Sequence, residues 1–531
     1  MTRTALSRRA LLAAAAAAPI AAPAISRAQG ARVLKYTPPA MINILDPVHG
    51  ATLITRIHSL MVYDTLYGID DAWVPQPQMA EGHVLEDGGK TWRITLRAGL
   101  RFHDGSPVLA RDCVASLRRW GKRDVMGQGI FEITDELSAP SDRVILWKLR
   151  KPYPLLPEAL GKMNNTIAAI LPERVANTDA FTAITDFTGS GPFRYVAAER
   201  VDGARTVYAK AETYVPRTSG APQIMAGPKL VHFDRVEWTI MPDASTAANA
   251  LAKGEIDWWS APIPDLLPVL RRNNAVRLDV LDPSGSVGVL RFNFLHPPFN
   301  KQAVRQAALA AISQRDVMLA VYGTDESLWR TPCGFFPPGT PNASDAGMAA
   351  LRDPPDLDAA RRLLAASGYA GEKITFNVAT EIATLKNQGD VVIDAWKKIG
   401  FNVDYVALAT SVIDARLANK GPVSEGGWSA FASSTTGYAA ATPVANNFLR
   451  GTGEKAIFGW PDIPRIEELR TAYIDAPDRA AQAAICRDLQ QVAFETLPYI
   501  PTGMWLPPTA YRADLADIRR GFPQFYGVRR V

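Results

Sequence analysis

The spacing of apolar residues between positions 86 and 120 predicts a strand followed by a helix. From Trp92 to Leu96 apolar and polar residues alternate, which is typical of a half-buried strand. From Val114 to Trp120 the apolar residues recur every three or four positions, which is typical of an amphipathic helix. Asp-Gly turns stand before the strand and between the two elements. We therefore predict a module of turn, strand, turn and helix.

The same two periods alternate along most of the remaining chain. The strands that they predict cover residues 33–36, 144–149, 236–241, 276–281, 287–294, 373–379 and 401–408. The predicted helices cover residues 55–66, 245–253, 301–322, 357–367, 388–399, 463–474 and 479–496. Asn300 and Asp356 stand where helix N-caps are expected. This alternation of strands and helices indicates an α/β fold with β-α-β crossovers.

Length and charge narrow the class of protein. The chain has 531 residues, too many for one ordinary core, so two or three domains are expected. Its formal net charge is +5, and residues 1–30 contribute four arginines and no acidic residue. Without that segment the chain is nearly neutral, which gives no support to a nucleic-acid or anionic-membrane partner.

The first residues predict an export signal. Arg8 and Arg9 precede an Ala-rich, weakly apolar stretch, a pattern that resembles a twin-arginine signal. Small residues at the −3 and −1 positions place cleavage after Ala28, so residues 1–28 would be removed and the mature protein would be periplasmic. The alternative is an uncleaved anchor. No later segment is apolar for long enough to span a bilayer.

Signatures of catalysis and metal binding are missing. The six histidines are scattered, and the chain contains no HExxH, no G-x-S-x-G, no P-loop and no dinucleotide-binding fingerprint. We therefore predict no enzyme activity, no metal and no cofactor. Cys113, Cys333 and Cys486 form no close-spaced pair. They are expected to be packed thiols. The alternative is that two of them form one disulfide in an oxidising compartment.

The segment DGGKTWRITLRAGLRFHDGSPVLARDCVASLRR resembles the signature of the extracellular solute-binding proteins of the dipeptide and oligopeptide type (family 5), the binding components of ABC importers. GSGPF at residues 189–193 and GEID at residues 254–257 resemble the same family. The resemblance extends over about residues 33 to 512.

The resemblance implies an α/β, two-lobed periplasmic-binding-protein fold with an extra subdomain on the first lobe. The first lobe would be discontinuous. The implied ranges are 31–70, 189–285 and 501–531 for the first lobe, 71–188 for the subdomain, and 286–500 for the second lobe.

The resemblance also suggests where a ligand binds. In the family, peptide binders keep a Trp and, three residues later, an Asp that pairs with the α-ammonium group of the ligand. Here Trp428 is followed by Ser429 and, at the third position, by Phe431. A cation without a counter-charge in a dry cleft is costly. A free peptide N-terminus is therefore disfavoured unless Asp124 or Glu381 replaces the missing carboxylate.

A second family anchor is also absent. The Arg that fixes a dipeptide's carboxylate precedes the helix that here begins near residue 388, and only the weaker Lys386 is present. These changes favour a neutral or aromatic ligand. We expect Trp428 and Phe431 to face it, with further contacts from Tyr36, Met41 and Asn43. The alternative is that Phe431 belongs to the core.

We therefore predict an exported, monomeric solute-binding protein of an ABC importer. It would capture a small organic solute between its lobes and deliver it to a membrane permease. The alternatives are a peptide-binding protein with altered anchors and, from another class, a secreted hydrolase, which the missing nucleophile motif disfavours. A metal or haem carrier would need clustered His, Cys or Met residues, which the sequence lacks.

Overall fold

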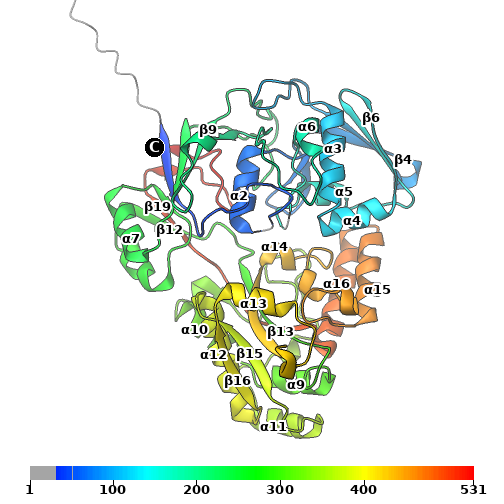
Figure 1. The fold of residues 1–531 in the computed structure, drawn as a ribbon, viewed down its shortest axis with the longest axis vertical. Helices are drawn as coiled ribbons and strands as arrows, with labels where there is room; N and C mark the ends of the chain where they lie inside the picture. The colour runs from blue at the N-terminus through cyan, green and yellow to red at the C-terminus, as the bar shows by residue number, and fades with distance from the viewer. Residues whose placement is uncertain (1–31, 51, 165) are drawn as a thin grey trace, which may run out of the picture.

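The computed structural model describes residues 32–50, 52–164 and 166–531, so the predicted signal peptide lies outside the described residues. Two large mixed sheets form the centres of two lobes, which occupy the upper and lower parts of Figure 1. Helices cover both sheets. The predicted α/β class is confirmed.

The first lobe is built on a seven-stranded sheet from distant parts of the chain. In sheet order its strands are β12 (Val276–Asp279), β19 (Thr509–Arg512), β11 (Trp258–Trp259), β1 (Val33–Thr37), β10 (Arg235–Thr239), β9 (Arg205–Lys210) and β8 (Phe193–Tyr195). Its helices are α2 (Leu53–Val62), α7 (Ala244–Lys253) and α8 (Leu267–Arg271). Two small two-stranded sheets complete the strands of this part: the hairpin of β2 (Tyr67–Ile69) with β3 (Pro75–Pro77), and β20 (Leu515–Ala516) with β21 (Arg529–Arg530).

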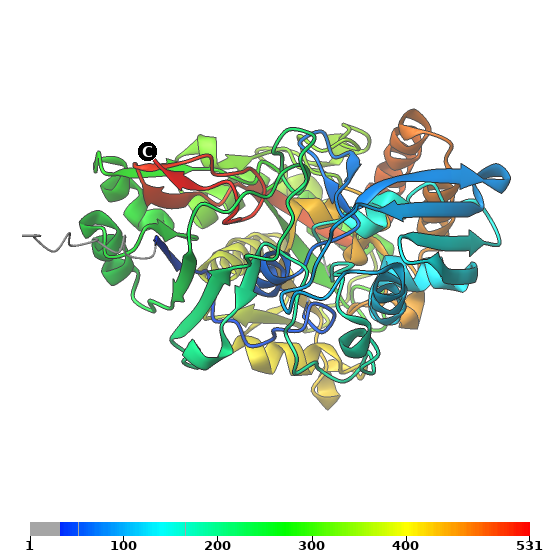
Figure 2. The same cartoon turned by 90° about the horizontal axis from the view of Figure 1, so that it is seen from above.

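A four-stranded antiparallel sheet stands at the end of the molecule opposite the C-terminus (Figure 2). Its strands, in order, are β4 (Ala80–Glu86), β5 (Thr91–Leu96), β7 (Val144–Leu149) and β6 (Thr134–Ser141). The accompanying helices are α3 (Ala110–Gly121), α4 (Val125–Glu132), α5 (Leu156–Gly161) and α6 (Glu173–Ala176). The strand and helix predicted between residues 86 and 120 are thus confirmed as β5 and α3.

A buried ion pair joins this sheet's helices to the first lobe. Arg119 of α3 donates from both terminal nitrogens to Asp46, at 3.0 and 2.8 Å, and both side chains are 1% exposed. Asp46 also accepts from the backbone N–H groups of Val48 and Ile184. The hydrogen bonds hold the pKa of Asp46 below its usual value although burial alone would raise it. A fully hydrogen-bonded pair of this kind fixes the orientation of α3.

The second lobe contains the six-stranded sheet. In order its strands are β14 (Trp329–Arg330), β18 (Tyr499–Trp505), β13 (Ser286–Phe292), β17 (Ala430–Thr436), β15 (Ile374–Ala379) and β16 (Val403–Leu408). Its helices are α9 (Gln302–Ala310), α10 (Gln314–Tyr322), α11 (Leu357–Ala366), α12 (Ala383–Ile399), α13 (Thr410–Leu417), α14 (Gly437–Ala440), α15 (Pro464–Asp475) and α16 (Arg479–Thr496). Asp356 caps α11 as predicted, because its side chain accepts from the N–H of Ala359 at 2.8 Å.

The single helix predicted over residues 301–322 is wrong. The structure has two helices, α9 and α10, separated at Ser313. Ser313 has an extended backbone, and its hydroxyl accepts from the N–H of Asp316, which makes it the N-cap of a new helix. The predicted cap Asn300 is not used, since the residue before α9 is Lys301.

Two short connectors, between β12 and β13 and between β18 and β19, carry the described chain between the lobes. Gly285 in the first connector has φ +60°, and a Cβ there would lie 2.4 Å from the carbonyl oxygen of Trp505 beside the second. The connectors therefore lie side by side. The predicted domain ranges stay a proposal, with one change: a boundary at residue 501 would cut β18, so we place it after Trp505.

Candidate functional site

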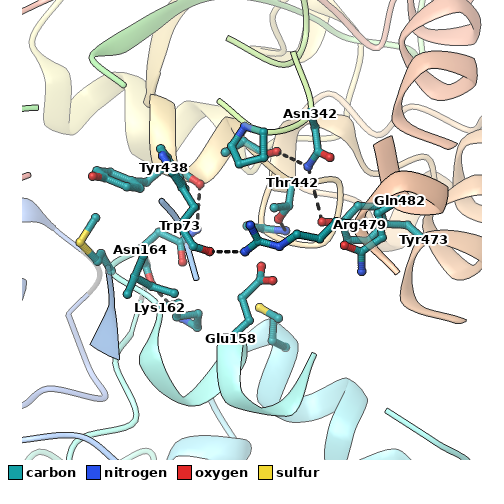
Figure 3. A pocket seen from close by; sticks show the side chains of 16 residues that line it. Trp73, Glu158, Lys162, Asn164, Asn342, Tyr438, Thr442, Tyr473, Arg479 and Gln482 are labelled. Atoms are coloured by element: carbon teal, nitrogen blue, oxygen red, sulfur yellow. Dashed lines mark hydrogen bonds between the residues drawn. The ribbon is translucent and has the colours of Figure 1, made fainter. Parts of the chain in front are cut away.

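A cavity of about 90 Å³ lies where the two lobes meet, with walls from both (Figure 3). One wall comes from the β2–β3 hairpin and from α5 and the segment after it. The other comes from α14, α15 and the start of α16. The aromatic and polar residues that line the cavity include Trp73, Glu158, Lys162, Asn164, Tyr438, Tyr473 and Arg479.

Trp73 reaches the cavity from the tip of the β2–β3 hairpin. The turn is held by Asp70, whose Oδ1 accepts from the N–H groups of Ala72 at 2.9 Å and Val74 at 2.8 Å. Trp73 itself has φ +63°, a backbone conformation that is uncommon outside glycine. Its ring lies 4.3 Å from the ring of Tyr438, measured between centroids. The hairpin of the first lobe thus places an aromatic ring against the second lobe.

Arg479, the first residue of α16, holds that hairpin from the opposite side. Its guanidinium donates to the carbonyl oxygens of Trp73 at 2.7 Å and Ala72 at 3.4 Å (Figure 3). An exposed ion pair between Lys151 and Asp475, at 3.0 Å, joins the same two parts of the molecule. Exposed pairs contribute little free energy, so the hairpin contacts carry more of this junction.

Glu158, in the first turn of α5, and Lys162, just after its last residue, line the cavity in contrasting environments. Nζ of Lys162 is saturated, since it donates to Asp124 at 2.7 Å and to the carbonyl oxygens of Asn164 and Thr166. Glu158 is part-buried, and no described residue hydrogen-bonds its carboxylate. Burial therefore raises its pKa to about 7, although the nearby Arg479 acts in the opposite direction.

Two buried polar atoms of the cavity residues also lack a partner among the described residues: Oδ1 of Asn164 and Oη of Tyr438. Native proteins rarely leave such atoms unsatisfied, because desolvation without a hydrogen bond costs free energy. Atoms of this kind beside a cavity are candidates for contact with a bound molecule.

A second cavity, of about 130 Å³, adjoins the first and shares Met163 and Tyr438 with it. It lies beside the connectors and is lined by Arg56, Asp282, Gly285 and other residues. Arg56 donates to the carbonyl oxygen of Met163 at 2.7 Å, while its Nε has no partner in the described chain. Burial raises the pKa of Asp282 to about 6, against hydrogen bonds from Ser284 and the charge of Arg56.

The sequence-predicted aromatic residues lie elsewhere. Trp428 and Phe431 are 1% and 5% exposed, and their rings pack 5.1 Å apart in a hydrophobic cluster with Trp460. Ser429 is buried beside them, and its hydroxyl accepts from the N–H of Thr375. None of the three lines either interlobe cavity. This placement favours the alternative that Phe431 belongs to the core.

The reason is the direction of β17. Phe431 is the second residue of this strand, whereas Thr436, its last residue, lines the second cavity. At about 3.4 Å per residue the two lie roughly 17 Å apart. Ligands of open α/β sheets bind beyond the carboxyl ends of strands. That rule, applied to β17, would have pointed to Tyr438 instead of Phe431.

The two predicted carboxylates are also committed elsewhere. Asp124 caps α4, accepting from the N–H groups of Met126 and Gly127, and pairs with Lys162 just behind the cavity. Glu381 is exposed and accepts from the N–H of Thr410. Neither lines an interlobe cavity. The carboxylates that do, Glu158 in the first cavity and Asp282 in the second, were not identified from the sequence.

The candidates near the N-terminus are separated from one another. Tyr36 is fully buried in the first lobe, packed against Trp258 and Phe525. Met41 is 41% exposed and lines a different, small surface cavity, and Asn43 is exposed. The structure does not bring these residues together with the interlobe cavities.

Other candidate chemistry is limited in the part of the chain that the structure describes. Cys113, Cys333 and Cys486 are all free and buried, so no disulfide links them. Residues 32–50, 52–164 and 166–531 contain no group of three or more His, Cys, Asp or Glu side chains placed to hold a metal ion. None of the helices in these ranges is both long and apolar enough to cross a membrane.

The chain is similar to known solute-binding proteins along nearly its whole length. Residues 74–449 match the family described as bacterial extracellular solute-binding proteins, family 5 (middle part). A probable peptide ABC transporter periplasmic-binding protein, y4tO, of Sinorhizobium fredii is 33% identical over 97% of both chains. The glutathione-binding protein GsiB of Pectobacterium atrosepticum is 25% identical, over 86% of this chain and 85% of its own.

Solved structures share the fold. The binding protein AgaA of A. tumefaciens R10, in complex with agropinic acid, has a TM-score of 0.76 at 20% identity, over 94% of this chain and 99% of its own. A dipeptide-binding protein of Pseudoalteromonas sp. SM9913, in complex with Met-Leu, has a TM-score of 0.75 at 18% identity, over 94% and 100%. The predicted two-lobed periplasmic-binding-protein fold is therefore confirmed.

Proposed function

Since the chain belongs to the bacterial extracellular solute-binding proteins of family 5, and is thus the substrate-binding component of an ABC importer and not an enzyme, we propose that it captures a small organic solute in the interlobe cavity that Trp73 and Tyr438 line. The single observation that carries this proposal is a cavity whose walls come from both lobes. A molecule held there contacts both lobes and stabilises their closed arrangement. The closed form would then be offered to the membrane permease.

The ligand is not an ordinary free dipeptide. Phe431 stands where peptide binders of the family have the Asp for the α-ammonium group, and no Arg precedes α12. The two cavities, of about 90 and 130 Å³, are also small beside the roughly 300–1,000 Å³ of typical ligand pockets. These observations support a compact solute.

A peptide ligand held by altered anchors is the second candidate. The name of the S. fredii relative and the Met-Leu complex of the Pseudoalteromonas protein favour it. The AgaA complex with agropinic acid shows that the same fold also holds a ligand that is not a peptide. Binding of unmodified dipeptides with saturation at micromolar concentrations would favour the peptide candidate.

Export completes the proposal. We place the mature protein in the periplasm as a monomer, after twin-arginine export and cleavage behind Ala28. The motif Arg8-Arg9 and the small residues before Ala28 support this route.

A thermal-shift screen of the purified mature protein against a metabolite library tests the proposal. A ligand at 100 times its dissociation constant adds about 2.7 kcal/mol to the free energy of unfolding. Each hit is then measured by calorimetry with the wild type and with Trp73→Ala. A hit whose affinity is unchanged by Trp73→Ala would place the site outside the interlobe cavity. Repeated turnover of a hit, seen by mass spectrometry, would revive the hydrolase alternative.

A further inference from the structure

We infer that the interlobe cavity binds the cationic nitrogen of its solute, an amino or guanidino group, with Glu158 of α5 as the counter-charge. This inference rests on the proposed capture of a solute between the lobes. It places the cation site on the first-lobe side of the junction, and not on the segment that follows Trp428.

The carboxylate of Glu158 is the only acidic group among the described residues that line this cavity. Figure 3 shows it pointing into the space below the guanidinium of Arg479. No described residue donates a hydrogen bond to it. A part-buried carboxylate without a donor attracts a cation because that cation supplies both charge and hydrogen bonds.

The basic residues of the cavity do not fill this role. The ammonium group of Lys162 donates to Asp124 and to two carbonyl oxygens, and Asp124 neutralises its charge. Arg479 donates to the carbonyl oxygens of Trp73 and Ala72, and although its charge lowers the pKa of Glu158, it forms no ion pair with a described residue within 4.0 Å. Arg479 is also exposed, so solvent screens its charge more than that of Glu158.

A second acceptor faces the same cavity. Asn164 is only 4% exposed, and its Oδ1 has no partner in the described chain. An ammonium or guanidinium group carries several N–H donors, which match several acceptors better than a neutral or anionic group does.

Aromatic side chains complete the match. Trp73, Tyr438 and Tyr473 all line the cavity. The faces of aromatic rings attract cations, most strongly when the pair is desolvated. A carboxylate combined with aromatic rings is a common way to hold an organic cation.

Titratable groups of the described chain that lie near Glu158 include Arg479 and Cys486 of α16, Tyr473 of α15, and Tyr153 before α5. Burial raises the pKa values of the two tyrosines and of Cys486 above their usual values, and Arg479 is a guanidinium. Lys162 and Asp124 form a pair of their own. Burial also lowers the pKa of Lys162. Glu158, with a pKa of about 7, is the group whose charge we expect to change between pH 6 and pH 8.

The test uses the full mature protein with agmatine and putrescine as cationic probes, 1,4-butanediol as a neutral probe and succinate as an anionic probe. We expect calorimetry to detect binding of at least one cation and of neither other probe. Glu158→Gln should weaken cation binding at least tenfold. The control Glu425→Gln, at an exposed site on the second lobe, should leave it unchanged.

The pH dependence provides a second measurement that needs no variant. Agmatine keeps its charge between pH 6 and pH 8, so its affinity for the wild type should rise as Glu158 ionises. Absence of binding by both cations, or cation binding that neither Glu158→Gln nor pH alters, would overturn the inference. If a neutral solute then bound and lost affinity in Trp73→Ala, the interlobe site would stand without its cation specificity.

Discussion

The rings of Trp73 and Tyr438 lie 4.3 Å apart between centroids, at an interplanar angle of 38°, although one belongs to a hairpin of the first lobe and the other to α14 of the second. Each ring also lines the interlobe cavity. The contact that closes the two lobes is therefore also a wall of the candidate site. The same two side chains would therefore contact a bound solute and hold the lobes together.

Trp73→Ala should weaken solute binding at least tenfold, because it removes both a wall of the cavity and the ring contact with Tyr438. Calorimetry with any solute found by thermal shift measures the loss. Phe181→Ala removes a 66%-exposed aromatic ring outside the cavity and serves as the control. Equal affinities for the wild type and Trp73→Ala would contradict the prediction.

Phe431→Ala should lower the free energy of unfolding by about 3–5 kcal/mol, since it leaves a cavity in a packed cluster. Urea denaturation without ligand measures this loss. We expect the folded fraction to keep its affinity for a solute. A stable variant with lost binding would restore the prediction that Phe431 faces the ligand.

Glu158 should make stability depend on pH. Its folded-state pKa is about 7, above the ordinary value of 4.5, so the folded protein holds the proton more tightly than the unfolded chain. The free energy of unfolding should therefore fall as pH rises from about 4.5 to 7. Glu158→Gln should remove this decline, with a gain on the order of 1 kcal/mol at pH 8 and little change at pH 4.5. Denaturation at both pH values checks the sign.

Asp124→Asn should destabilise the protein by about 3–5 kcal/mol, because it leaves the charge of Lys162 buried without its partner. The double variant Asp124→Asn with Lys162→Met should recover part of the loss, since it removes the stranded charge. Urea denaturation of the two variants distinguishes an unpaired charge from a lost helix cap. No recovery in the double variant would assign the effect to the cap of α4.

Replacing Arg8 and Arg9 by Lys should abolish delivery to the periplasm if export uses the twin-arginine route. Cell fractionation with antibody detection measures the protein in each compartment. A variant that changes Arg27 to Lys controls for the loss of a single arginine in the same segment. Undiminished periplasmic protein after the double replacement would contradict the prediction.

Local patterns predicted the elements well, whereas the site depends on contacts that the patterns do not contain. The strand at β5 and the cap of α11 follow from the spacing of nearby residues. The cavity instead joins residue 73 to residue 438 and residue 158 to residue 479. No periodicity records such distant pairs, and the positive φ of Trp73 is unusual for its residue type.

The placement of Phe431 away from the interlobe cavities has a different origin. The prediction transferred a ligand contact by its distance from Trp428 along the sequence, without asking which end of the strand meets the cleft. β17 runs from the packed cluster toward the cavity, so the end with Thr436 and Tyr438 is the relevant one. The direction of a strand, which follows from the topology, would have pointed to the other end of β17.

The two connectors, which lie side by side at Gly285 and Trp505, form the hinge about which the lobes would rotate. The second cavity lies at this point, lined by Gly285 and Pro507. A molecule that fills this cavity separates the lobes close to the connectors, whereas the rims of the lobes lie far from the connectors. A small difference in the thickness of the bound molecule therefore becomes a larger difference in the spacing of the rims. The membrane permease would then distinguish bound solutes by the angle between the two lobes.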